Sequence, residues 1–150
     1  MKKNQAHLLI SSLSGLFLII LDQTFKYLAR AYYADSYYLW NPWLGWEYFP
    51  NYGIAFSLPF PYPLLIIATP LLLLWFIIQV KERKNTPLFN TGLIFVIAGA
   101  FSNLIDRIIF NFTIDYIRIF TAVLNLADII IVGGAVVCFL ADRRARKKGK

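Results

Sequence analysis

GAFSNLIDRIIFNFTIDYIRIFTAVLNLAD, residues 99–128, is the stretch that decides the fold, because it places three carboxylates in a chain that is mostly apolar. Asp106, Asp115 and Asp128 are costly beside a bilayer, where the water that would solvate a charge is missing. Acidic residues in such a place usually face a protein interior and serve a function. We therefore expect the rest of the chain to hold these three side chains together.

Length and composition place the chain in a membrane. It has 150 residues, of which 59% are hydrophobic and 15% are charged, and this is too apolar for a soluble protein of its size. A hydrocarbon core of about 30 Å is crossed by about 20 helical residues. Four segments approach that length, so we predict one integral membrane domain over residues 1–150, with spans at about 7–28, 63–80, 88–109 and 123–140.

The net charge of +7 is placed so that it predicts topology rather than nucleic-acid binding. Lysine and arginine occur before the first span, at residues 81–84 and at residues 143–150, whereas residues 31–62 contain neither. The positive-inside rule then places both termini and the middle loop in the cytoplasm. We expect the basic tail to touch anionic membrane lipid, and we expect no nucleic-acid partner.

Residues 31–62 differ from the spans in composition. They are rich in tyrosine, tryptophan and phenylalanine, interleaved with proline and glycine, which break helices. Aromatic rings are favoured where one side is apolar and the other is wet, so we expect short strands and turns on the outer leaflet. The predicted fold class is an all-α membrane protein with four transmembrane helices and a small extracytoplasmic β platform between helices 1 and 2.

Helical spacing brings polar side chains together within the predicted spans. Three groups fall at i, i+3 or i+4 and share a helix face: Asp22 with Lys26, Asn103 with Asp106 and Arg107, and Asn125 with Asp128. We interpret the first group as a structural ion pair near the outer interface.

The depth of the acidic residues follows from the rise of a helix. Asp106 lies about 27 Å from Leu88, close to the outer surface, and Asp128 lies about 8 Å inside Val123. Asp115 falls in the outer connection between the last two spans. All three carboxylates are therefore expected near the outer face, beneath the aromatic platform.

The residue types present limit the possible chemistry. His7 is the only histidine and Cys138 the only cysteine, so a histidine-activated nucleophile is very hard to build and a zinc site of the usual type is excluded. No cofactor motif is present, and we expect neither metal nor cofactor. Two adjacent carboxyl groups can share one proton and activate water for attack on a carbonyl, which is aspartic peptidase chemistry.

Three other functions remain open at this point. Intramembrane acids also serve small four-helix proton-coupled transporters, which would need a carboxylate near the membrane midplane. A serine/lysine peptidase would use Ser57 or Ser102 with Lys26 as the base. In a structural or assembly protein the aspartates would only form hydrogen bonds between helices.

Five sequence blocks resemble the successive signature blocks of bacterial lipoprotein signal peptidase, also called signal peptidase II. They are LDQTFK at 21–26, NYGIAFS at 51–57, AGAFSNLIDR at 98–107, TIDYI at 113–117 and NLADI at 125–129. Their order, the four-span topology and the length agree with that family, and the resemblance covers essentially the whole chain.

The resemblance implies an aspartic endopeptidase of the bacterial inner membrane with its active site near the periplasmic face. Such an enzyme removes the signal peptide from prolipoproteins, cutting just before a cysteine that carries diacylglycerol. The implied catalytic pair is Asp115 and Asp128. The implied partners are the prolipoprotein signal peptide with its diacylglyceryl cysteine, membrane lipids, and inhibitors of the globomycin type.

The resemblance also assigns supporting residues. Asp106 is implied to be structural, and Arg107 to contact substrate or hold the site. The positions that line the pocket are Asn51, Gly53, Asn103 and Asn125, and those that stabilise it are Asp22 and Lys26. The chain departs from the common pattern at three positions: Ser102 stands where many members have glycine, and Thr113 and Tyr116 stand where valine and phenylalanine are commoner.

Overall fold

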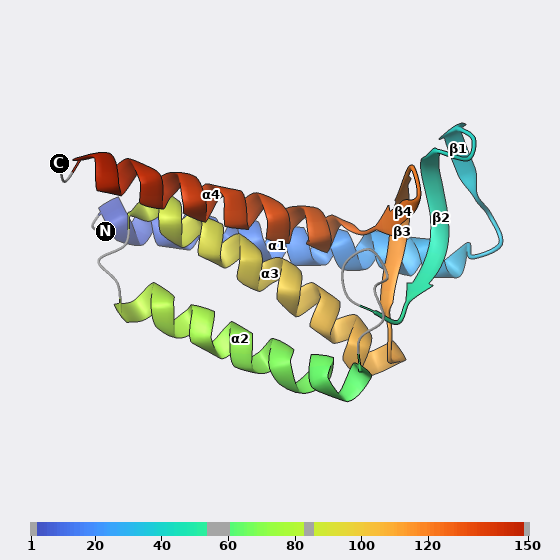
Figure 1. The fold of residues 1–150 in the computed structure, drawn as a ribbon, viewed down its shortest axis with the longest axis horizontal. Helices are drawn as coiled ribbons and strands as arrows, with labels where there is room; N and C mark the ends of the chain where they lie inside the picture. Colours follow the sequence, from blue (N-terminus) through green and yellow to red (C-terminus); the bar gives the residue numbers. More distant parts are fainter. Residues whose placement is uncertain (1–2, 54–60, 83–85, 149–150) are drawn as a thin grey trace.

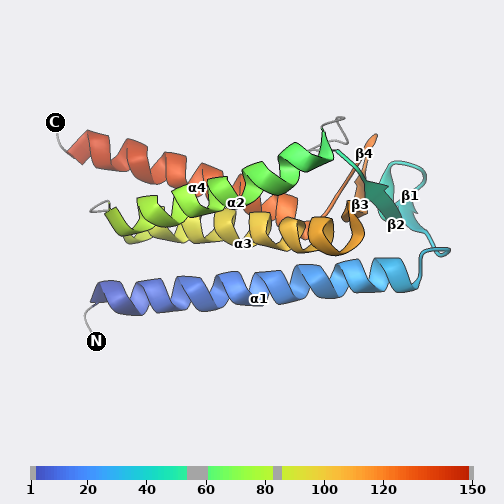
Figure 2. The same ribbon diagram turned by 90° about the horizontal axis from the view of Figure 1, so that it is seen from below.

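The structure is a computed structural model that describes residues 3–53, 61–82 and 86–148. Within them it has the helices α1 (Lys3–Ala31), α2 (Tyr62–Glu82), α3 (Pro87–Phe110) and α4 (Leu126–Lys148), and the strands β1 (Tyr37–Trp40), β2 (Leu44–Asn51), β3 (Thr113–Ile119) and β4 (Ala122–Leu124). The helices run lengthwise, and the strands gather at one end, opposite the two termini (Figure 1). Figure 2 shows α3 lying between α1 on one side and α2 and α4 on the other.

The strands form one antiparallel sheet in the order β1-β2-β3-β4. The β platform was predicted to come only from the segment between helices 1 and 2. This is correct for β1 and β2 but wrong for β3 and β4, which come from the connection between α3 and α4. Strand β2 would otherwise be an open edge, and β3 covers it, with Asn51 opposite Thr113 and Phe49 opposite Asp115. Asp115 therefore lies on a regular strand rather than in an irregular connection.

The last helix begins later than its predicted span. Val123 and Leu124 belong to β4, and α4 starts at Leu126. The start is displaced because pairing with β3 competes with helix formation, and Val123 is opposite Arg118 in that pairing. The predicted part of the platform at residues 54–60 lies outside the described residues.

The apolar surface of the helices suits a lipid environment. Among the described residues, two helices, Gln5–Ala31 and Pro87–Phe110, are long and apolar enough to cross a membrane, and Pro63–Ile78 is a shorter apolar helix. Large apolar side chains are exposed along the bundle, such as Phe17 and Val132, and exposure on that scale is unusual for a protein surrounded by water. The count of four spans remains a prediction.

Glycines allow α3 and α4 to pack closely. A Cβ atom at Gly92 would lie 2.7 Å from the carbonyl oxygen of Gly134, and one at Gly99 would lie 2.5 Å from the carbonyl oxygen of Ala127. Helices in membranes approach this closely where small residues remove the steric barrier between backbones. The contact at Gly99 brings the middle of α3 against the first turn of α4.

This packing predicts different stabilities for two glycine-to-alanine variants. Gly99→Ala adds a methyl group against the α4 backbone, whereas a Cβ at Gly133 meets nothing within 4 Å. We expect Gly99→Ala to lower the free energy of unfolding by about 1–2 kcal/mol relative to Gly133→Ala, because both gain helix propensity but only the first is overpacked. Thermal unfolding in detergent measures this, and equal stability of the two variants would contradict the close approach.

Candidate active site

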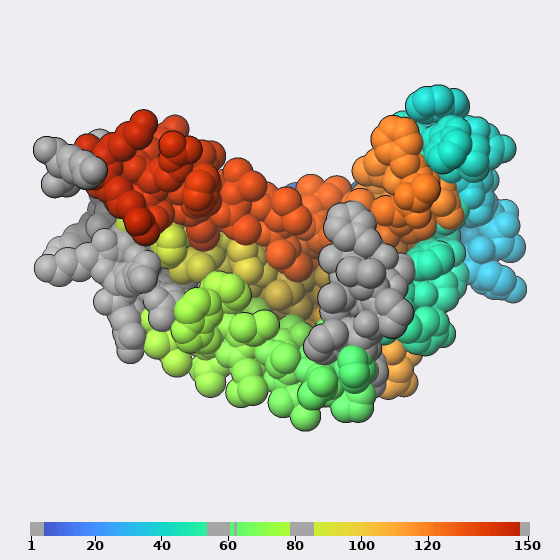
Figure 3. All heavy atoms as spheres, viewed as in Figure 1, coloured from blue at the N-terminus to red at the C-terminus, as the bar shows by residue number. Residues whose placement is uncertain are grey.

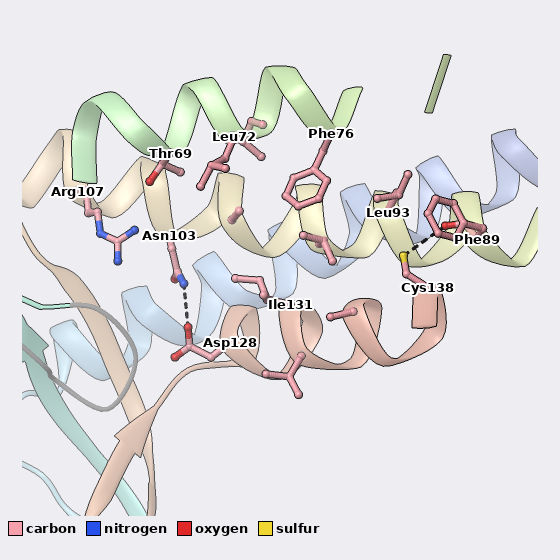
Figure 4. Close-up of a pocket in the computed structure, with 15 residues that line it drawn as sticks. Thr69, Leu72, Phe76, Phe89, Leu93, Asn103, Arg107, Asp128, Ile131 and Cys138 are labelled. Carbon is pink, nitrogen blue, oxygen red and sulfur yellow. Dashed lines mark hydrogen bonds between the residues drawn. The ribbon is translucent and has the colours of Figure 1, made fainter. Parts of the chain in front are cut away.

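Asp128 is held by the start of its own helix. Asn125 precedes α4, and its side-chain Oδ1 accepts a hydrogen bond of 2.9 Å from the backbone N–H of Asp128. In return, Asp128 Oδ2 accepts a bond of 3.3 Å from the backbone N–H of Asn125. This reciprocal arrangement is a capping box, which satisfies N–H groups that a helix leaves unpaired at its first turn. From α3, Asn103 Nδ2 donates to Asp128 Oδ1 at 2.9 Å (Figure 4).

Asp115 is fully buried on β3 and accepts two amide hydrogen bonds. Asn51 Nδ2 on β2 donates to its Oδ2 at 2.8 Å, and Asn125 Nδ2 donates to its Oδ1 at 2.7 Å. Asn125 thus bonds to Asp115 with its amide nitrogen and to Asp128 with its amide oxygen. One side chain therefore brings the two predicted catalytic residues together.

The surroundings of Asp115 raise the pKa of its carboxyl group to about 7. Burial is the main cause, because it disfavours the charged form, and the negative charge of Asp128 adds to it. Hydrogen bonds from Asn51 and Asn125 and the positive charge of Lys26 act in the opposite direction. The negative charge on either carboxylate makes ionisation of the other less favourable. Two such acids are suited to hold one proton between them.

The three asparagine amides are oriented by groups that can only donate. Lys26 Nζ donates to Asn103 Oδ1 at 2.8 Å, and the backbone N–H of Gly53 donates to Asn51 Oδ1 at 2.9 Å. The amide oxygen of each asparagine must face its donor, which leaves the NH₂ group for an aspartate. The predicted pocket residues Asn51, Gly53, Asn103 and Asn125 therefore all act on the pair.

The predicted ion pair between Asp22 and Lys26 is confirmed, and Lys26 has two further partners. Its side chain is 1% exposed, and Nζ lies 2.8 Å from Asp22 Oδ2 and 2.9 Å from Asp106 Oδ2, besides its bond to Asn103. An ammonium group has three N–H bonds, and here each has an acceptor. Lys26 is thus bound as a cation, whereas a serine/lysine peptidase needs it as a neutral base. Ser102 Oγ donates to Asp22 Oδ2 at 2.7 Å, and Ser57 lies outside the described residues.

Asp106 and Arg107 point to different places although both are near Asn103 on α3. At 100° per residue, Asp106 lies about 60° to one side of Asn103 and Arg107 about 40° to the other. Asp106 accepts bonds from Gln23 Nε2 at 3.0 Å and from the backbone N–H of Ile114 at 3.1 Å, so it joins α1 to the start of β3. Arg107 lines a cavity together with Asn103 and Asp128 (Figure 4).

Two of the departures from the family pattern meet at Asp22. Ser102 Oγ donates to Asp22 Oδ2 at 2.7 Å, and Tyr116 Oη donates to Asp22 Oδ1 at 3.0 Å. Tyr116 Oη also accepts the N–H of Leu126 at 3.1 Å, and Asp22 Oδ1 accepts that of Ala127 at 3.1 Å. With Asn125, these groups satisfy the first three N–H groups of α4. Sequence reasoning gave Gln23 and Tyr116 no role in the site, and Ser102 was considered only as the nucleophile of a serine/lysine peptidase. The one signal for their supporting role was their place inside the signature blocks.

The cavity next to Asp128 has a volume of about 600 Å³ and lies between α2, α3 and α4. Figure 3 shows the surface hollowed between α2 and α4, with α3 as the floor. Asn103, Arg107 and Asp128 lie at one end, and the walls beyond them are apolar, with Leu72 and Phe76 from α2. The cavity reaches Cys138, which is about 15 Å along α4 from Asp128. Among the described residues, no three His, Cys, Asp or Glu side chains are grouped as a metal site.

Comparisons with known proteins agree with this geometry. A family model described as signal peptidase (SPase) II matches residues 15–142. The lipoprotein signal peptidase of Sinorhizobium fredii is 34% identical over 140 residues, which cover 87% of this chain and 84% of that protein. That of Caldanaerobacter subterraneus is 32% identical over 129 residues, covering 81% of this chain and 87% of that protein. A solved structure of a bacterial membrane enzyme has the same fold, with a TM-score of 0.82 over 94% of this chain and 92% of that chain at 22% identity.

We expect the hydroxyl of Tyr116 to contribute measurably to the stability of the fold. Tyr116→Phe leaves the N–H of Leu126 without its acceptor and Asp22 without one donor, so the free energy of unfolding should fall by about 1–2 kcal/mol. Thermal unfolding in detergent measures the change. Tyr32→Phe removes a hydroxyl from an exposed ring and is the matched control. If the two variants unfold at the same temperature, Tyr116 does not brace the start of α4.

Proposed function

Because this chain belongs to the signal peptidase II family and is a protease that cleaves lipoprotein signal peptides, we propose that Asp115 and Asp128 are its catalytic pair. We further propose that the substrate is a diacylglyceryl-modified prolipoprotein and that the cut falls just before the lipidated cysteine. The observation that carries the proposal is the bridge made by Asn125, which donates to Asp115 Oδ1 with its side chain and to Asp128 Oδ2 with its backbone N–H, while Asp128 lines the cavity.

The proposed reaction uses one water molecule and one shared proton. The ionised carboxylate of the pair removes a proton from water as the water oxygen attacks the scissile carbonyl carbon. The protonated carboxyl gives its proton to the carbonyl oxygen, which forms a tetrahedral diol. The diol then collapses: one of its hydroxyls returns a proton to the pair as the carbonyl re-forms, the C–N bond breaks, and the leaving amine takes a proton from the pair, so that the pair again holds one shared proton. The raised pKa of Asp115 supports a pair that holds this proton near neutral pH.

The cavity supports an apolar, extended substrate. Its apolar walls match the hydrophobic segment of a signal peptide or an acyl chain, and its polar end presents Asn103, Arg107 and Asp128. Arg107 lines the same end of the cavity as Asp128, so we place its guanidinium against a backbone carbonyl of the substrate near the cleavage site. Burial of an apolar segment would supply binding energy away from the bond that breaks. A globomycin-type inhibitor would occupy the same cavity.

Membrane topology belongs to the same proposal. We place the sheet and the carboxyl pair at the periplasmic face of the inner membrane and both termini in the cytoplasm. The exposed ring of Phe120 contacts the exposed rings of Trp40 and Trp43 at the tip of the sheet, and this supports the placement because such rings favour the membrane–water interface. A transporter needs a carboxylate midway along the helices, whereas Asp128 is in the first turn of α4.

Substitution of either aspartate by asparagine tests the catalytic pair. Asp115→Asn and Asp128→Asn should each lower turnover of a diacylglyceryl-modified prolipoprotein by about 10³-fold or more, because asparagine neither takes nor gives the proton. The matched control is Asp35→Asn, on an exposed loop beside the sheet, which should retain wild-type turnover. If an aspartate variant unfolds at a lower temperature but turns over substrate normally, that aspartate is structural rather than catalytic.

The pH dependence follows from the raised pKa of Asp115. Above about pH 7 this carboxyl loses the shared proton, so kcat/KM should fall as pH rises through that value. The same proton contributes to stability: it is bound in the folded chain but not in the unfolded chain between about pH 4 and pH 7, so this contribution is full at lower pH and is lost as pH rises through 7. Initial rates at limiting substrate give the profile, and a flat kcat/KM from pH 5 to pH 9 would contradict it.

A further inference from the structure

A second cavity lies at the end of the helices that is farthest from the sheet. It has a volume of about 360 Å³ and is lined by Thr86 and Leu88 at the start of α3 and by Ala141, Arg144, Ala145 and Lys147 near the end of α4. Both helix ends lie beside the C-terminus (Figure 1). Arg144 is about 24 Å along α4 from Asp128, so this cavity is separate from the candidate active site.

The lining of this cavity combines apolar walls with a cationic rim. Leu88, Ala141 and Ala145 supply the apolar part, and Arg144 and Lys147 are exposed cations at its edge. Long cationic side chains commonly bury their carbon stems against apolar surface while the charged group stays outside. The cavity therefore offers an apolar chain and an anion adjacent places to bind.

The neighbouring cations on α4 have partners of their own. Arg146 Nε lies 2.9 Å from Asp142 Oδ2, and the guanidinium of Arg143 lies 5.8 Å from the ring centre of Phe139. Asp142 is the only carboxylate among the described side chains from Cys138 onward, and it is paired with Arg146. The charges of Arg144 and Lys147 are therefore not neutralised by the acid on their own helix.

We propose that this cavity binds one acidic phospholipid of the leaflet opposite the candidate active site. The phosphate lies between Arg144 and Lys147, and one acyl chain lies against Leu88, Ala141 and Ala145. A free phosphate would use the cations but leave the apolar walls unused, whereas a phospholipid matches both. Basic pockets between transmembrane helices bind lipid headgroups in this way. The lipid joins the start of α3 to the end of α4 and does not depend on the peptidase reaction.

Two double variants with equal charge loss test the proposal. Arg144→Gln with Lys147→Gln removes the rim of the cavity, and Arg143→Gln with Arg146→Gln removes two cations from the same turns outside it. The proteins are placed in nanodiscs of phosphatidylcholine, with or without phosphatidylglycerol, and thermal unfolding is followed. We expect phosphatidylglycerol to raise Tm by about 3 °C in the wild type and in the Arg143/Arg146 variant, and not in the Arg144/Lys147 variant.

Each other outcome overturns the site. If both double variants lose the phosphatidylglycerol-dependent rise of Tm equally, the effect is a diffuse attraction between a basic helix end and an acidic surface. No effect of phosphatidylglycerol on the wild type would mean that no acidic lipid binds. An equal rise of Tm with inorganic phosphate in phosphatidylcholine nanodiscs would mean an anion site without an acyl chain. No substrate is present, so these results are independent of whether Asp115 and Asp128 are the catalytic pair.

Discussion

The ammonium group of Lys26 is the interaction on which the rest of the site depends. It binds Asp22, Asp106 and Asn103, and so ties α1 to α3 and, through Asn103, to Asp128 on α4. Burying Asp22 and Asp106 without a cation would cost several kcal/mol for each charge, roughly speaking. Because Lys26 is already paired with two carboxylates, its charge only partly offsets the burial that raises the pKa of Asp115.

The groups that build the fold and the groups that orient the aspartates are the same. Asn125 caps α4 and bridges the pair. Asp22 forms an ion pair with Lys26 and also accepts a hydrogen bond from the backbone N–H of Ala127 in the first turn of α4. The hydroxyls of Ser102 and Tyr116 complete the shell of Asp22 in this chain. The geometry of the proposed catalytic pair is therefore maintained by ordinary helix capping and ion pairing. Loss of any of these side chains would lower the stability of the fold and change the orientation of the aspartates.

Sequence analysis predicted the local features and missed the non-local ones. The pairing of Asp22 with Lys26 follows from helical spacing, and the family blocks named the residues that surround the carboxyl pair. The sheet was assigned to one connection because nothing in residues 31–62 reveals that β2 pairs with β3, far away in the chain. The start of α4 was misplaced for the same reason, since β4 is defined by its partner rather than by its own pattern. The role of Tyr116 depends on three elements at once, which spacing along one helix cannot show.

The division of the sheet between two distant connections has a consequence for synthesis of the protein. Asn51 and Asp115 are 64 residues apart, yet they are bonded, and Asn125 and Asp128 follow later still. A nascent chain whose final helix is still inside the ribosome has the residues of all four strands but only one member of the acidic pair, because Asp128 lies in α4. Peptidase activity is therefore expected only once translation is complete, which protects neighbouring membrane proteins from a half-made protease.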